Sequence, residues 1–119
     1  AAATALRSDH KFLTPWLETF NKRRRMIVDG LNAIDGIKCA EPLGAFYAFP
    51  DVTGCFGKSI NGREIKDSMS FSQVLLDEAN VSVVPGVAFG EDSCVRLSYA
   101  TSETVIRKGL DRLAAALKK

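Results

Sequence analysis

Three segments of the chain carry apolar residues at the spacing of a helix that is buried along one side. The longest of them runs from about Leu13 to Ile34. We expect Thr14 to cap this helix, Pro15 to lie in its first turn and Gly36 to end it. Its apolar positions, which we expect to be core residues, are Leu13, Trp16, Leu17, Phe20, Ile27, Leu31 and Ile34.

Two shorter helices are predicted further along the chain. One begins at Asp67 or Ser68, is capped there, and stops near Asn80. The other follows Ser102 and continues almost to the end of the sequence. Their apolar stripes are Phe71, Val74, Leu75 and Ala79 in the first, and Ile106, Leu110, Leu113 and Leu117 in the second.

Strands are predicted between these helices, at residues 43–49, 81–84 and 94–99, with loops at 53–63 and 85–93. The order of elements is therefore helix, strand, helix, strand, strand, helix. The simplest way to bury the apolar stripes is a two-layer α+β domain. It would have a small, mostly antiparallel sheet of three to four strands, with the helices packed on one face.

The composition agrees with one globular domain. The chain has 119 residues, of which 46% are hydrophobic and 25% charged, which excludes disorder; no apolar run is long enough to cross a membrane. A net charge of +2 gives no reason to expect a nucleic-acid or lipid partner.

Three cysteines without a CxxC spacing indicate free thiols in a reducing, cytoplasmic compartment, although an organelle stays open. A single histidine argues against a zinc site or a Ser-His-Asp centre.

A basic run, residues 22–25, interrupts the apolar stripe of the first helix. We interpret it as a solvated face rather than a nucleic-acid patch, because no aromatic residues are interleaved with it. Arg24 is in line with the stripe, so contact with another domain or subunit stays as open as a solvated position. His10 is expected on the surface, and Cys94 is expected to be a packed thiol.

Arg96 is the strongest candidate for a functional residue. In the strand 94–99, Val95 and Leu97 point to one side and Arg96 to the other. If helices cover the first side, Arg96 stands on the uncovered face. A lone arginine in a strand is usually a solvated edge position, but the glycine-rich loop before it is typical of the mouth of a site. A guanidinium matches a carboxylate with two parallel hydrogen bonds, so Arg96 could bind an anion.

Two stretches of the sequence resemble a known family. VVPGVAFGEDSCVRLSYATS, residues 83–102, resembles the C-terminal part of the fold-type I, class I aminotransferases, and most closely their aspartate aminotransferase branch. PLGAFYAFPDV, residues 42–52, is similar to the first strand of the small domain in that family. GLNAIDGIKC before it and SETVIRKGLDRLAAAL at the end follow in the same order.

The resemblance implies that residues 1–119 are the small, C-terminal domain of a pyridoxal-phosphate-dependent aminotransferase. Such an enzyme moves an amino group between an amino acid and a 2-oxo acid. Arg96 matches the arginine that binds the substrate α-carboxylate, and Gly44 and Phe46 match residues that approach the substrate pocket. Pro85 and Gly86 match the turn that shapes its entrance.

The resemblance also implies that most of the catalytic apparatus lies elsewhere. No lysine here has the Ser-Lys setting of the lysine that carries the cofactor, so we expect no catalytic, cofactor-binding or metal-binding residue in this chain. A preceding large domain would hold pyridoxal phosphate and form most of a homodimer, and this fragment alone would be inactive. Residues 1–7 would end a helix between the domains. The alternative is a stand-alone α+β ligand-binding or regulatory domain with an anion site at Arg96; a protein-interaction module using the exposed sheet face is a weaker one.

Overall fold

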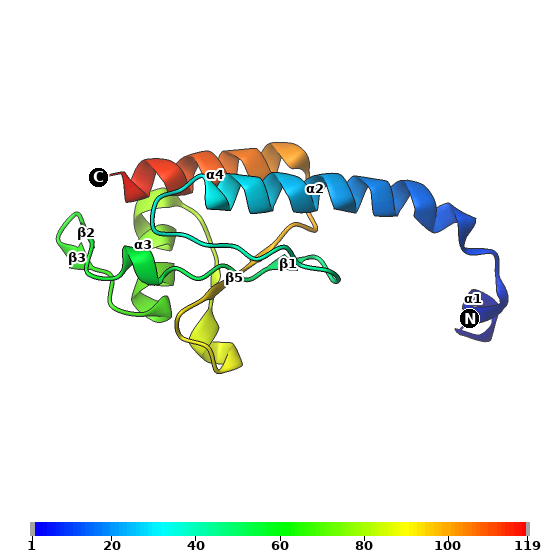
Figure 1. Ribbon diagram of the computed structural model, residues 1–119, viewed down its shortest axis with the longest axis horizontal. Helices are drawn as coiled ribbons and strands as arrows, with labels where there is room; N and C mark the ends of the chain where they lie inside the picture. Colours follow the sequence, from blue (N-terminus) through cyan, green and yellow to red (C-terminus); the bar gives the residue numbers. More distant parts are fainter. Residues whose placement is uncertain (1, 119) are drawn as a thin grey trace.

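Two long helices lie side by side over a short antiparallel sheet (Figure 1). The computed structural model describes residues 2–118. Its helices are α1 (Ala2–Arg7), α2 (Thr14–Asn32), α3 (Ser68–Ala79) and α4 (Glu103–Leu117), with single turns η1 (His10–Leu13), η2 (Thr53–Cys55) and η3 (Gly86–Phe89). Its strands are β1 (Tyr47–Ala48), β2 (Ser59–Ile60), β3 (Arg63–Glu64), β4 (Val84–Pro85) and β5 (Val95–Ser98).

The main sheet has the strand order β1-β5-β4, and both pairings are antiparallel. Tyr47 lies opposite Ser98, and Val84 lies opposite Arg96. Strands β2 and β3 form a separate hairpin. The helices α2 and α4 pack together, and α3 packs against α4 and β4. The two-layer α+β architecture predicted from the sequence is confirmed, and the sheet has three strands.

The core lies between the helices and the near face of the sheet. Leu31 of α2, Phe71 of α3 and Leu113 of α4 are almost fully buried there, together with Val95 and Tyr99 of the central strand region. Each such side chain contributes roughly 1.5–3 kcal/mol through the apolar surface it removes from water. The helix-facing side of the sheet therefore contributes to the stability of the fold.

The ends of α3 and α4 follow the predicted capping residues. Asp67 caps α3 by accepting a hydrogen bond from the Ser70 N–H, and Asn80 ends it in the left-handed conformation. Ser102 caps α4 by accepting from the Val105 N–H. These signals are local, since each depends on residues within one turn, and they could be recognised without knowing the fold.

The first half of α2 differs from the prediction. Trp16 was expected in the core, but its exposed fraction is 64%, and Leu17 is also exposed. The reason is that this half of the helix, together with α1, projects beyond the sheet (Figure 1), so that the molecule measures 56 × 28 × 22 Å. The cap is Leu13 rather than Thr14, because η1 leads directly into the helix.

Several other predicted boundaries were wrong. The helix α2 ends at Asn32 with Ala33 as its C-cap, and Gly36 lies beyond it, in a left-handed conformation against the backbone of Gly54. The strand expected at 43–49 is limited to β1, because Ala45 has a φ of 57° and turns the chain before Tyr47. The segment 53–63 was expected to be a loop but contains η2, β2 and the start of β3, and the strand expected at 81–84 is β4, at 84–85.

Within residues 2–118, none of the helices combines the length and the apolar character that a membrane-spanning segment needs.

Gly86 permits the close approach of two backbone segments beside the central strand. A Cβ atom at this position would lie 2.1 Å from the carbonyl oxygen of Glu91 and 2.2 Å from that of Cys94. Only a glycine fits between them without a backbone shift, so the turn that leaves β4 depends on Gly86.

We expect Gly86→Ala to lower the free energy of unfolding by roughly 1–3 kcal/mol, as overpacking of a rigid contact does. Gly109→Ala is the matched control, because a Cβ atom there meets no atom within 4 Å. Since Gly109 lies inside α4, alanine should stabilise the chain by roughly 0.5–1 kcal/mol. Urea unfolding of both variants measures the difference, and equal stability of Gly86→Ala and the wild type would contradict the packing argument.

Candidate functional site

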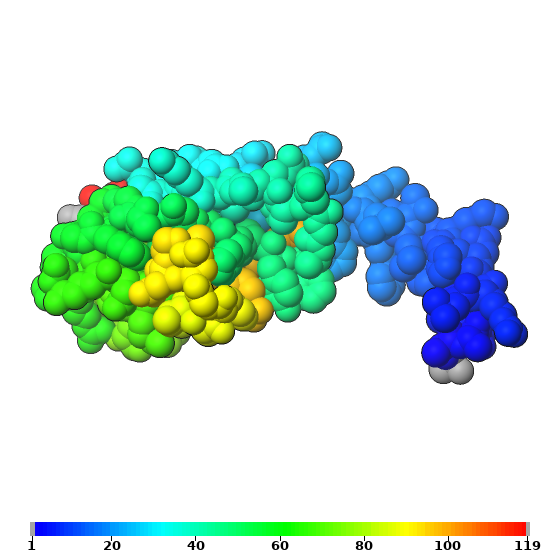
Figure 2. Space-filling model, turned by 60° about the horizontal axis from the view of Figure 1, so that its bottom comes forward, coloured from blue at the N-terminus to red at the C-terminus, as the bar shows by residue number. Residues whose placement is uncertain are grey.

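Arg96 lies on the face of the sheet that the helices leave uncovered. It belongs to the central strand β5. Its neighbours Val95 and Leu97 point to the opposite face of the sheet, where Val95 is buried and Leu97 packs against the core. Its own side chain is half-buried, and Ser98 on the same face is exposed. The alternation seen in the sequence therefore predicts the orientation of this strand correctly. Figure 2 turns this side of the molecule toward the reader, and the yellow loop containing η3 lies across it.

Two aromatic rings enclose the guanidinium of Arg96. Its central carbon lies 4.4 Å from the centre of the Tyr47 ring and 4.3 Å from the centre of the Phe89 ring. Phe49 meets the edge of Phe89, with 6.1 Å between the ring centres. Contacts of this kind are worth roughly 0.5–2 kcal/mol each, and they limit the rotamers open to the arginine. The rings thus hold the charged group in one place.

Within residues 2–118, no acidic side chain neutralises the charge of Arg96. None of the ion pairs found within residues 2–118 involves this side chain. A half-buried, unpaired guanidinium presents two parallel N–H donors, which fit the two oxygens of a carboxylate. The geometry therefore supports the binding of a planar anion at this face.

The loop that supplies Phe89 is attached to the first turn of α3. The buried Ser68 donates two hydrogen bonds to Asp92 Oδ1, from its hydroxyl (2.5 Å) and from its backbone N–H (3.0 Å). The Ser68 hydroxyl oxygen also accepts from the Val87 N–H at 3.2 Å. Because Val87 and Asp92 lie on either side of Phe89, these bonds fix the loop at both ends. The aromatic lid over Arg96 is therefore preorganised.

Gly44 and Phe46 lie just before β1 rather than beside Arg96. Gly44 is exposed, and nothing lies within 4 Å of where its Cβ atom would be. Phe46 is 41% exposed and packs against Phe20 of α2, with 6.4 Å between the ring centres. The backbone joins this segment to β5, since the Tyr99 N–H donates to the Phe46 carbonyl. The structure thus places these residues in the turn that leads into β1, the strand beside β5, and not in contact with the guanidinium of Arg96. Their part in substrate binding stays a prediction.

The sequence analysis missed the aromatic residues around Arg96. Tyr47 and Phe49 alternate with the buried Ala48, so they point to the same face as Arg96 once β1 is paired with β5. The alternation that we applied to residues 95–99 would have found them if it had also been applied to residues 46–49. Phe89 carried no such signal, because its position depends on the fold of the loop.

The cysteines and the histidine behave as expected of structural residues. Cys39 and Cys55 are buried free thiols, and burial raises the pKa of each, so that both are protonated at neutral pH. Cys94 is a half-buried free thiol, and His10 is exposed in η1. In the described part of the chain, no group of three or more histidine, cysteine or acidic side chains is placed to hold a metal ion.

Comparison with known proteins identifies relatives along nearly the whole chain. Residues 1–113 match the family model described as "Aminotransferase class I and II". An aspartate aminotransferase of Rhizobium meliloti (strain 1021) is 46% identical over 117 residues, which are 98% of this chain and 28% of that protein. An aspartate/prephenate aminotransferase of Cereibacter sphaeroides is 43% identical over 97% of this chain and 29% of its own length. The chain therefore spans less than a third of the length of these relatives.

Solved structures agree with the sequence comparison. The crystal structure of the aspartate aminotransferase from Rhizobium meliloti matches with a TM-score of 0.95 and 45% identity, over 98% of this chain and 30% of that one. An alanine aminotransferase from Pyrococcus furiosus matches with a TM-score of 0.86 and 27% identity, over 97% of this chain and 28% of that one.

We expect Ser68→Ala to loosen the loop over Arg96. The change removes the hydroxyl that bridges Asp92 and Val87, so the Val87 N–H loses its acceptor and Asp92 Oδ1 keeps only the bond from the backbone N–H of position 68, at a cost of roughly 0.5–1.5 kcal/mol. Amide hydrogen exchange should become faster at Val87, beyond any change in global stability. Ser72→Ala is the matched control, because the Ser72 hydroxyl donates only within α3, to the Ser68 carbonyl. Unchanged exchange at Val87 in Ser68→Ala would show that the loop does not depend on this bridge.

Proposed function

Because this chain belongs to the class I and II aminotransferases, we propose that it forms the small domain of a pyridoxal-phosphate-dependent aminotransferase of the aspartate type. The complete enzyme would transfer an amino group between an amino acid and a 2-oxo acid. The share of each relative that the chain covers, about 29%, supports a further proposal. A large cofactor-binding domain would belong to the same polypeptide.

The observation that carries the proposal is Arg96 on the open face of the sheet, where its side chain takes part in none of the ion pairs within residues 2–118. We propose that its guanidinium binds the α-carboxylate that every amino acid and 2-oxo acid substrate shares. The aromatic contacts of Tyr47 and Phe89 support this role, because they keep the guanidinium in position before a substrate arrives. A preorganised donor pair loses less side-chain entropy on binding than a free arginine would.

The contribution of this domain would be orientation. Two hydrogen bonds from Arg96 to one carboxylate fix both the position and the rotation of the substrate about its Cα atom, which is the kind of positioning that accelerates a reaction without any bond being made by the arginine. Because Arg96 is on a strand rather than on a loop, movement of the whole domain toward the substrate would carry the arginine with it. Closure of this kind excludes water from a reacting centre.

The described residues do not fit pyridoxal phosphate itself. An amine that carries such a cofactor needs an enclosed, desolvated setting. Lys58 is only half-buried and lies 3.7 Å from Asp35, and the remaining described lysines are exposed: Lys11, Lys22, Lys38, Lys66, Lys108 and Lys118. We therefore propose that the cofactor is held outside this domain, and that residues 2–118 supply substrate binding but no step of the chemistry.

A reducing environment and a homodimer complete the proposal. The three cysteines are free thiols in this structure, which supports a reducing compartment such as the cytoplasm. Homodimer formation is proposed from the resemblance to the family.

We expect Arg96→Leu, made in the full-length enzyme, to lower kcat/KM. The loss should correspond to roughly 2–5 kcal/mol of transition-state stabilisation, the usual cost of leaving a desolvated carboxylate without its partner. Arg107→Leu on the exposed side of α4 is the control, and its kcat/KM should stay at the wild-type value. Steady-state kinetics with an amino acid donor and a 2-oxo acid acceptor provide the measurement. If Arg96→Leu keeps the wild-type kcat/KM, the assignment of Arg96 is rejected. A full-length protein without any amino transfer would reject the proposed function as a whole.

A further inference from the structure

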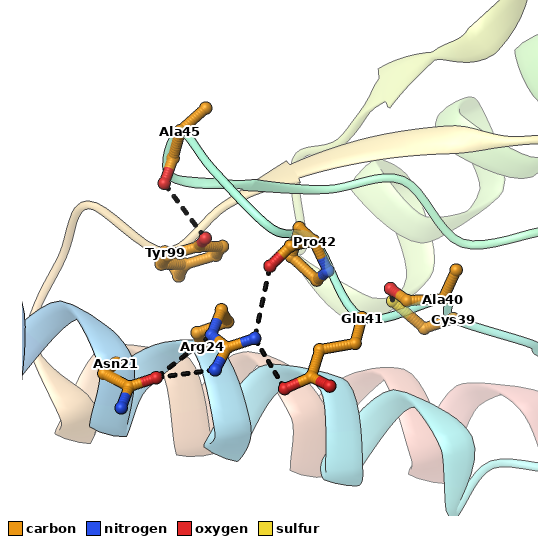
Figure 3. A network of polar contacts seen from close by, with 8 residues as sticks. All are labelled: Asn21, Arg24, Cys39, Ala40, Glu41, Pro42, Ala45 and Tyr99. Atoms are coloured by element: carbon orange, nitrogen blue, oxygen red, sulfur yellow. Dashed lines mark hydrogen bonds and ion pairs between the residues drawn. The ribbon is translucent and has the colours of Figure 1, made fainter.

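The segment Glu41–Phe46, here called the entrance loop and distinct from the turn at Pro85 and Gly86, is held against α2 at its first two residues. Arg24 Nη1 donates to Glu41 Oε1 at 2.5 Å and to the Pro42 carbonyl at 3.2 Å (Figure 3). The Arg24 side chain is only 21% exposed. Nε and Nη2 of the same guanidinium donate to Asn21 Oδ1, at 3.2 and 2.6 Å, which fixes the arginine on its own helix.

The sequence left open whether Arg24 meets solvent or another domain or subunit. The structure gives a third answer, because Nε, Nη1 and Nη2 all donate to acceptors inside the chain. An arginine with its planar fork engaged on both sides defines the distance and the angle between the two segments that it joins. Arg24 therefore joins α2 to the start of the entrance loop.

Tyr99 holds the other end of the entrance loop. Its ring is almost fully buried, and its hydroxyl donates to the Ala45 carbonyl at 3.1 Å (Figure 3). Burial raises the pKa of the Tyr99 phenol, although the charge of Arg24 opposes this effect, so the hydroxyl keeps its proton at neutral pH and can donate. The Tyr99 N–H also donates to the Phe46 carbonyl at 2.9 Å.

Between the two anchors the entrance loop has little other support. Leu43 is 98% exposed, and Gly44 has open space around its Cα atom. Ala45 has a φ of 57°, which costs an alanine roughly 1–2 kcal/mol because its Cβ atom approaches the backbone. A strained residue in an exposed segment persists only where its neighbours determine its conformation, and the hydrogen bond from Tyr99 is made to the carbonyl of that residue.

We propose that Arg24 and Tyr99 are positioning residues, which fix the entrance loop from both ends in the conformation that receives the substrate. This inference rests on the proposed function and on the predicted part of Gly44 and Phe46 in substrate binding. Neither Arg24 nor Tyr99 needs to touch the substrate. They act through the loop, whose shape they determine before binding, and binding then loses less conformational entropy.

The first test uses this chain alone and does not depend on catalysis. We expect Arg24→Gln and Tyr99→Phe each to lower the backbone NMR order parameters of Gly44 and Ala45 from the rigid range, about 0.85, toward the flexible range, below about 0.6. Cleavage by chymotrypsin after Leu43 should become about tenfold faster.

Arg25→Gln is the control for the helix, because Arg25 is exposed next to Arg24. Urea unfolding separates loss of loop order from loss of global stability, and Tyr99→Phe, which removes one oxygen atom, carries the test if Arg24→Gln fails to fold.

The second test uses the full-length enzyme. We expect both variants to raise KM for the amino acid substrate about tenfold while kcat changes less, because the loop has to be ordered before binding. Arg24→Lys keeps a cation near Glu41 but not the fork, so its KM should lie between the wild type and Arg24→Gln.

Two results would overturn the inference. One is an entrance loop that stays as ordered in both variants as in the wild type. The other is an unchanged KM in an enzyme whose wild type transfers amino groups, which would leave the proposed function standing. Absence of amino transfer in the wild type would instead reject the proposed function, and with it the substrate role of the loop.

Discussion

The contact of Arg96 with two aromatic rings, on the side of the sheet without helices, is the interaction on which the functional account depends. An arginine side chain in a strand is usually solvated and free to change its rotamer. Here the central carbon of the Arg96 guanidinium lies over the rings of both Tyr47 and Phe89, and none of the ion pairs within residues 2–118 involves it. The arrangement therefore confines the group in space while leaving its charge uncompensated. That combination suits the recognition of an external anion better than it suits the stability of the chain.

The remainder of the domain supports this arrangement through two anchored loops. Ser68 and Asp92 attach the loop that carries Phe89 to the first turn of α3. Arg24 and Tyr99 attach the entrance loop to α2 and to the end of β5. Both loops leave the same short sheet, one on each side of the central strand. The core beneath them, built from α2, α3 and α4, makes the sheet rigid enough for these loops to keep their positions relative to one another.

Features that depend on neighbouring residues could be predicted from the sequence, whereas features that depend on distant partners could not. The caps Asp67 and Ser102 and the alternation around Arg96 are of the first kind. The exposure of Trp16 and the engagement of Arg24 are of the second kind, because the first depends on how far α2 projects beyond the sheet and the second on Glu41 and Pro42. The strand predicted at residues 43–49 was too long for a related reason, since the left-handed Ala45 is stabilised by a tyrosine more than fifty residues away.

The central claim is tested most directly by the Nε–Hε NMR signal of Arg96 in this chain, assigned by its loss in Arg96→Lys. Because the guanidinium lies over two ring faces, the account requires an Hε shift to higher field than that of the exposed Arg25 and Arg107, and a further, saturable change when a small monocarboxylate such as lactate is added. The contradicting result is an Arg96 signal that coincides with those of Arg25 and Arg107 and does not move as the carboxylate is added. It would mean that the rings do not confine the guanidinium and that the guanidinium does not bind an anion.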